Sequence, residues 1–204
     1  MSNTCDSLIS IGVSPNCDDP IVKGLEPNGV ILNRQDLDFG SVTFNETRKN
    51  VVETLALKTG KKGYPVFIPG NTPFTGTNTT LETGNFGNTF ANNVGMVILD
   101  NGPDVCSKLI DGIANGEFVV ILENKYKNLN KDSAPGDSAF QIYGFYSGLK
   151  ASTLENDKYS EDTNGGWNVV LAETGSPRSA LFLFKTDYTT TKAAFDSLTE
   201  EPSL

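Results

Sequence analysis

The chain has 204 residues, 37% of them hydrophobic, and its 25 acidic and 16 basic side chains give a formal net charge of −9. This length suits one domain that buries a sizeable core without disulfide or metal staples. The acidic surface repels nucleic acid and anionic membranes, which argues against specific DNA binding through a basic face. We expect no membrane span and no signal peptide, because no apolar run approaches about 18 residues and the N-terminus lacks a basic region followed by an apolar stretch.

The side chains that most enzymes use are scarce in this sequence. There is no histidine, which removes Ser-His and Cys-His nucleophile pairs and the commonest transition-metal ligand. The chain has three cysteines, Cys5, Cys17 and Cys106. Cys5 and Cys17 could pair, but the odd number favours free thiols in a reducing compartment. We therefore expect no enzyme activity, no cofactor and no metal centre.

One polar, acidic loop, residues 156–166, resembles the middle of a calcium-binding loop. Alignment on Gly165 puts Leu171 where a bidentate glutamate should stand, so the EF-hand interpretation fails. A solvated loop is the favoured interpretation. The alternative is an irregular calcium site that uses Asp157, Glu161 and Asp162.

The N-terminal part of the chain predicts an extension followed by strands. Residues 1–28 are mixed in character and read as an extension or arm, in which residues 8–13 form a short strand. Apolar runs bounded by polar turns then predict strands that begin at Gly29 and cover residues 41–44 and 51–58.

Residues 71–93 are rich in Thr, Asn and Gly, yet they contain Phe74, Phe86 and Phe90. A soluble monomer seldom leaves three phenylalanines in a polar loop. We interpret the segment as strand and loop material that packs against a neighbouring subunit through these side chains. The alternative is that the phenylalanines fold back onto their own core.

The next segments predict a strand, a helix and a strand in succession. A continuous apolar run predicts a buried strand over residues 94–100. Pro103 suits the first position of a helix that ends at Asn115-Gly116, and four apolar side chains fall on one helical face: Val105, Leu109, Ile110 and Ile113. A further strand is expected over residues 118–126.

The C-terminal part predicts strands and a closing helix. An aromatic strand is expected over residues 139–149, and a β-hairpin pairs residues 167–173 with 180–186 around the turn TGSPRS. A short helix over residues 189–198 is capped by Asp187 or a neighbouring Thr, and residues 199–204 form a loose tail. The expected fold is mainly β with one or two helices, in a single structural domain over residues 1–204.

The C-terminal half resembles the end of bacteriophage virion proteins of the tail-tube (major tail protein) type, in particular those of phages that infect Bacteroidetes. The matching residues are the aromatic strand AFQIYGFYSGLKAS, the loop DTNGGW, the strand ALFLFKTD and the helix TTTKAAFDSL. The stretch LDNGPDVCSKLIDGIANGEFVVILENKYKN is similar to such proteins in a less specific way.

This resemblance implies a β-sandwich or rolled barrel flanked by a helix. It implies a homo-oligomer, with hexameric rings that stack into a tube in the phage tail and subunits made in the cytoplasm of the bacterial host. The partners are then other copies of the chain and other tail proteins, while DNA passes without specific binding. The acidic excess is expected on the lumen, with candidates near the predicted strands that could equally solvate outer faces: Asp36, Asp38, Glu53 and Glu123.

Two alternatives remain beside the tube subunit. One is another virion structural protein, such as a capsid decoration or tail-terminator protein. The other is a carbohydrate-binding β-sandwich in which three aromatic side chains form a sugar-stacking platform: Trp167, Tyr143 and Tyr146.

Overall fold

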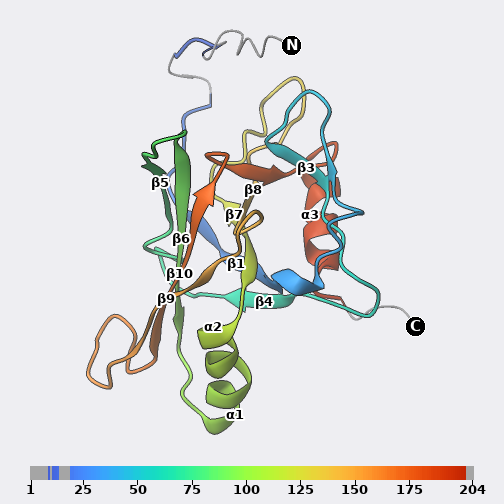
Figure 1. The fold of residues 1–204 in the computed structure, drawn as a ribbon. Coiled ribbons are helices and arrows are strands. Elements are labelled where there is room, and N and C mark those ends of the chain that lie inside the picture. Colours follow the sequence, from blue (N-terminus) through green and yellow to red (C-terminus); the bar gives the residue numbers. More distant parts are fainter. Residues whose placement is uncertain (1–8, 10, 14–18, 201–204) are drawn as a thin grey trace.

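The computed structural model describes residues 9, 11–13 and 19–200. The described part of the chain forms eleven strands in two sheets, with helical segments at one end and on one side (Figure 1). The expectation of a mainly β fold with one or two helices is confirmed. The expected strand at residues 8–13 falls partly outside the described residues, and the described ones, 9 and 11–13, belong to no strand.

The larger sheet has seven strands in the order β2-β3-β11-β8-β7-β1-β4. Their bounds are β1 Leu25–Asn33, β2 Thr43–Phe44, β3 Val51–Thr54, β4 Tyr64–Phe67, β7 Phe118–Asn124, β8 Phe140–Tyr143 and β11 Leu181–Leu183. The pairs are antiparallel except β11 with β3, which is parallel. A short helical turn, η1 Arg34–Asp36, follows β1.

The smaller sheet has four antiparallel strands in the order β5-β6-β10-β9. Their bounds are β5 Asn78–Glu82, β6 Thr89–Ile98, β9 Lys150–Asn156 and β10 Trp167–Ser176. Figure 1 shows this sheet on the left, the larger sheet in the middle and the C-terminal helix on the right. The molecule therefore has three layers.

Two apolar cores separate these layers. Alternate residues of β7 point to opposite faces, so Val120 and Leu122 pack toward the four-stranded sheet while Val119 and Ile121 pack toward the C-terminal helix. This burial on both faces explains the continuous apolar run in β7. The helix, α3 Tyr188–Ser197, begins as expected, because Asp187 accepts a hydrogen bond from the Thr190 backbone N–H.

The predicted helix after residue 100 forms as three consecutive segments. They are α1 Pro103–Val105, the π-helical turn η2 Cys106–Ile110 and α2 Asp111–Asn115. Ile110 and Ile113 are buried, and Ile113 belongs to the core between the sheets. Together these segments cover one end of the two sheets (Figure 1). None of the helices in the described part of the chain combines the length and the apolar character that a membrane crossing requires.

The predicted C-terminal hairpin is wrong. β10 pairs with β6 and β9 in the small sheet, whereas β11 pairs with β8 and β3 in the large sheet. The turn TGSPRS therefore carries the chain from one sheet to the other. The β6–helix–β7 unit likewise joins strands of different sheets.

A buried aspartate ties the loop before β8 to the loop before β3. Asp137 accepts hydrogen bonds from Arg48 Nη1 at 2.8 Å, Lys131 Nζ at 2.6 Å and Asn128 Nδ2 at 3.2 Å. Burial alone would raise the pKa of Asp137, but the hydrogen bonds from Lys131 and Asn128 outweigh it and hold the pKa below its usual value. The folded protein therefore favours the ionised form of this side chain.

We expect the stabilising effect of Asp137 to depend on pH. Because its pKa is lower in the folded state, the contribution is complete above the ordinary value of about 3.9 and is lost as the pH falls through the folded-state pKa. In urea, Asp137→Asn should have a lower free energy of unfolding than the native chain at pH 7. This difference should be smaller at about pH 3. The exposed Asp132 in the same loop supplies the control Asp132→Asn. A stability difference for Asp137→Asn that stayed constant with pH would contradict this account.

Candidate assembly interface

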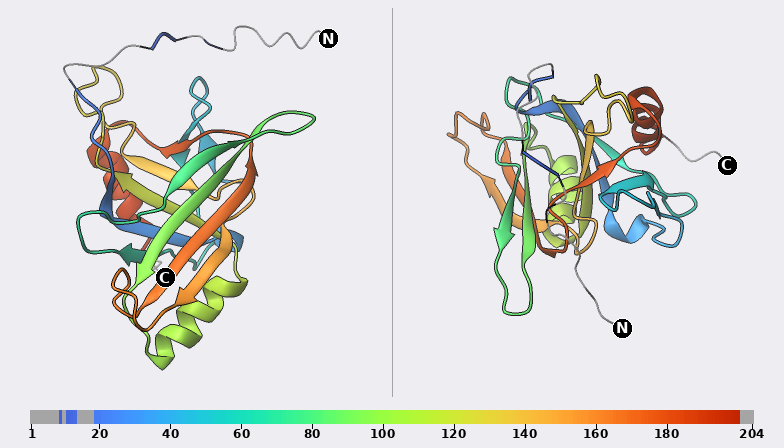
Figure 2. Two further views of the ribbon diagram at one scale, coloured as in Figure 1. Left: turned by 90° about the vertical axis from the view of Figure 1, so that its left-hand side faces the viewer. Right: turned by 90° about the horizontal axis from the view of Figure 1, so that it is seen from above.

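One face of the four-stranded sheet is left uncovered by the described part of the chain. Val94, Met96, Val169 and Leu171 point into the core between the sheets, so their neighbours along β6 and β10 point outward. Figure 2 (left) shows this outward face with no helix or strand in front of it. Its side chains are mostly small or uncharged, and they include Asn78, Thr80, Ala91, Asn93, Val97, Thr153, Asn168, Val170 and Ala172.

Few charges lie on this face. They are Glu82 on β5 and two side chains on β9, Glu155 and Lys150, of which Lys150 is paired with Glu117. Glu82 is partly committed within the subunit, since its Oε2 accepts the Gly175 backbone N–H at 3.0 Å. The face is therefore close to neutral, which differs from the acidic surface that the overall charge suggests.

The edge strands of this sheet are β5 and β9. On its outer side, neither pairs with another strand of the described chain. The Gly95 backbone N–H points toward the β5 side, because it donates to Thr77 Oγ1. Successive residues of a strand direct their N–H and C=O groups to opposite sides. Through the pairing of β5 with β6, this places the N–H and C=O groups of Thr79 and Leu81 on the open side of β5. An open strand edge of this kind is a ready template for pairing with another chain.

The three phenylalanines of residues 71–93 have different environments. Phe74 is only 2% exposed and belongs to the core between the sheets, so its expected contact with a neighbouring subunit is corrected. Phe90 is half-buried on β6. Phe86 is fully exposed in the loop that joins β5 and β6, and this hairpin loop projects from the body of the molecule (Figure 2).

The acidic side chains proposed for a lumen do not lie on the uncovered face. Asp36 is 8% exposed and pairs with Lys61 Nζ at 3.4 Å, and Glu123 is 4% exposed and accepts the Tyr188 hydroxyl at 2.7 Å. Burial and this bond to Glu123 raise the pKa of Tyr188 above its usual value. These two buried carboxylates cannot present charge to a lumen, and both expectations are corrected.

The other two candidates are half-buried and engaged in local hydrogen bonds. Asp38 accepts the Ser41 hydroxyl at 2.6 Å, and Glu53 on β3 accepts Asn45 Nδ2 at 2.7 Å. Both belong to the region of the seven-stranded sheet, so neither contributes to the uncovered face of the small sheet. The predicted group of four acids is thus not brought together.

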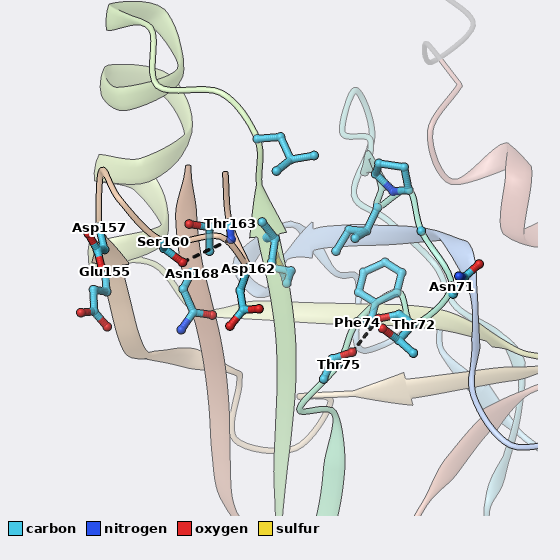
Figure 3. Close-up of a pocket in the computed structure, with 16 residues that line it drawn as sticks. Asn71, Thr72, Phe74, Thr75, Glu155, Asp157, Ser160, Asp162, Thr163 and Asn168 are labelled. Carbon is cyan, nitrogen blue, oxygen red and sulfur yellow. Dashed lines mark hydrogen bonds between the residues drawn. The ribbon is translucent and has the colours of Figure 1, made fainter. Parts of the chain in front are cut away.

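A groove of about 580 Å³, lined by both polar and apolar side chains, lies beside the C-terminal end of β6. Figure 3 shows Phe74 and the hydroxyl residues Thr72 and Thr75 on one side, and Asp157 and Asp162 on the other. Thr75 Oγ1 donates to the Thr72 carbonyl at 2.6 Å, so one hydroxyl is already engaged. Within residues 19–200 and the few described before them, no three His, Cys, Asp or Glu side chains come together as a metal site would need.

The aromatic platform of the carbohydrate-binding alternative is not assembled. Tyr143 is buried in the core between the sheets, and Trp167 packs against that core while its Nε1 donates to Asn101 Oδ1 at 3.1 Å. Tyr146 lies in the turn after β8 and packs against the other core. These three rings therefore do not share one exposed surface.

The comparisons with known proteins gave no relative. The chain matches no protein-family model, no curated protein and no solved structure.

Proposed function

We propose that this chain is a structural subunit that assembles with copies of itself, as a phage tail-tube protein does. The observation that carries the proposal is the four-stranded sheet, which has two edge strands without a second strand partner in the described chain and one face that the described chain leaves uncovered. Pairing β9 of one copy with β5 of the next would continue the sheet from subunit to subunit. A heterologous contact of this type closes into a ring if the rotation between copies closes.

In such a ring the uncovered face would line the lumen. Its amide, hydroxyl and small apolar side chains offer passing DNA no row of lysines or arginines. Basic wall groups would bind the phosphates by releasing counterions, so a nearly neutral wall lets DNA slide. We therefore expect a lumen of low charge in place of a strongly acidic one. Asp36 and Glu123 do not contribute to its wall.

The proposal is tested first on the purified chain. We expect light scattering to show species much larger than the 21.9 kDa subunit, and negative-stain electron microscopy to show rings or tubes. A decoration or terminator protein would give isolated oligomers without tubes. A chain that stays monomeric at high concentration would contradict the proposal.

The substitution Leu81→Pro tests the open edge of β5. Proline removes one outward N–H and is tolerated at an edge, so the subunit should keep its circular dichroism spectrum while ring formation is lost. Leu81→Val is the matched control, because it keeps the backbone donor, and it should assemble as the native chain does. Normal rings from Leu81→Pro would show that β5 does not pair between copies.

A further inference from the structure

An apolar groove lies at the opposite end of β6 from the hairpin loop. It has a volume of about 240 Å³ and lies between β4, the end of β6 and the helical segment. Ile31 and Ile113 form buried parts of its lining, whereas four large side chains of the lining remain exposed: Tyr64, Phe67, Leu99 and Leu109. Phe67 is the most exposed of these four side chains, at 64%. Exposed apolar surface gathered in a concavity marks an interaction site.

Two of the three outward N–H positions on the adjoining edge of β4 cannot take part in strand pairing, and only that of Phe67 remains. The Gly63 N–H that would point outward is taken by the Leu198 carbonyl at 2.6 Å, and Pro65 has no N–H. The Ile68 N–H points the other way, to the Pro27 carbonyl of β1, as the alternation along the strand requires. We therefore expect side chains in the groove, more than an added strand, to hold a partner of this region.

The same chain carries a side chain of matching chemistry. Phe86 is fully exposed in the loop between β5 and β6, with no large apolar neighbour within its segment Thr83–Asn88. A cavity of about 150 Å³ lined by apolar side chains is known to hold a benzene ring, so the groove has room for one phenyl group. The size and the apolar character of the Phe86 ring therefore match the groove.

Position and charge agree as well. β6 begins directly after the loop and ends at the groove, and its ten residues span roughly 33 Å. Figures 1 and 2 both place the loop at one end of the molecule and the helical segment at the other. The hairpin over residues 78–93 carries a single charge, Glu82, whereas the loop before β4 has three lysines and no acid: Lys58, Lys61 and Lys62. Asp36 pairs with Lys61, so the loop and Asp36 together keep a net positive charge.

We propose that the hairpin loop of one copy inserts Phe86 into the apolar groove of a second copy. The loop and the groove lie far apart on one subunit, so a copy cannot fill its own groove. Two different surfaces meet in this contact, and copies can therefore add head to tail. The inference rests on the proposed self-assembly and names the surfaces that join successive copies.

The test uses one variant on each side of the contact. Phe86→Ser removes the inserted ring, and Leu109→Glu places a charge in the groove. Both side chains are exposed, so each variant should fold with the native melting temperature. Each should raise the concentration needed for half assembly by roughly 10- to 100-fold, which corresponds to about 1.4–2.8 kcal/mol at 1.4 kcal/mol per tenfold. Tyr159→Ser, at an exposed aromatic in another loop, is the matched control and should assemble normally.

Mixing the two variants separates this contact from a general loss of apolar surface. Phe86→Ser keeps an intact groove and Leu109→Glu keeps an intact loop, so one contact still forms between them. Light scattering on the mixture should show a finite species with twice the mass of that formed by either variant alone. A mixture that does not combine would overturn the contact.

The outcome also distinguishes this inference from the proposed function. If the native chain assembles and Phe86→Ser assembles equally well, the inference fails while self-assembly stands. If the native chain remains monomeric at every concentration, both fail.

Discussion

Replacing Phe140 by alanine is expected to lower the free energy of unfolding by about 3–5 kcal/mol. Phe140 is fully buried on β8, in the middle of the seven-stranded sheet, and it packs against helix α3. Its ring centroid lies 4.9 Å from that of Phe195 and 5.9 Å from that of Tyr188, both in stacked arrangements. Alanine would leave a cavity between the sheet and the helix, because the strands around β8 cannot collapse into it.

Denaturant unfolding of Phe140→Ala measures this effect directly. Phe140→Leu is the control, since it keeps an apolar side chain of intermediate volume and should cost clearly less. A loss below about 1.5 kcal/mol for Phe140→Ala would show that the helix repacks, contrary to the close packing of protein interiors. The total free energy of unfolding of a protein is only about 5–15 kcal/mol. The alanine variant should therefore keep little stability at 37 °C.

The elements that the sequence predicted well have signals confined to a few neighbouring residues. Helix α3 starts beside the predicted cap, because the Asp187 side chain accepts the N–H of a residue three positions later. The run that forms β7 is apolar throughout, and the structure buries both of its faces. Neither conclusion needed knowledge of distant partners.

Strand pairing was not predictable in the same way. The turn TGSPRS suits a hairpin by composition, but β11 is paired with β3, which is more than a hundred residues earlier in the chain. Local turn chemistry does not distinguish a return within one sheet from a crossing to another. The assignment of β10 and β11 to one hairpin failed for that reason.

The environment of each phenylalanine also depends on distant residues. Phe74 is buried because Gly29 on β1 leaves room for it: a Cβ at Gly29 would lie 3.1 Å from Phe74 Cζ. Phe86 has a similar polar neighbourhood in the sequence and remains in solvent. The pattern of residues 71–93 therefore predicted an unusual segment without showing which ring belongs to the core.

The apolar groove and the uncovered sheet face were not recognised in the sequence. Tyr64, Phe67, Leu99 and Leu109 come from three separate segments, and only the fold brings them together. The alternation in β10 did contain a usable signal, because Glu173 shares a face with Val169 and Leu171. A glutamate on an apolar face indicates a buried carboxylate that needs hydrogen-bond donors.

Glu173 supplies the second large effect that we expect. It is 2% exposed, and its carboxylate joins the small sheet to the turn that follows β8. One oxygen accepts the backbone N–H groups of Tyr146 at 3.1 Å and Ser147 at 2.9 Å. The other accepts the Gly144 N–H at 3.1 Å and Asn92 Nδ2 at 2.9 Å. The carbonyl side of the same turn is held by Arg34, whose Nη2 donates to the Tyr146 carbonyl at 2.6 Å.

Glu173→Ala should therefore cost at least about 4 kcal/mol, because a buried donor left without its acceptor costs about 1–3 kcal/mol and four lose theirs. Glu173→Gln should cost nearly as much, although it has almost the same shape. An amide has one oxygen, so it can serve only two of the four donors, and its NH₂ group would face the other two. Glu155→Gln on the exposed side of the same sheet is the control, with an expected change within about 0.5 kcal/mol. Urea unfolding of the three variants decides the point: a glutamine variant as stable as the native chain would mean that shape, and not the acceptance of four hydrogen bonds, is what Glu173 contributes.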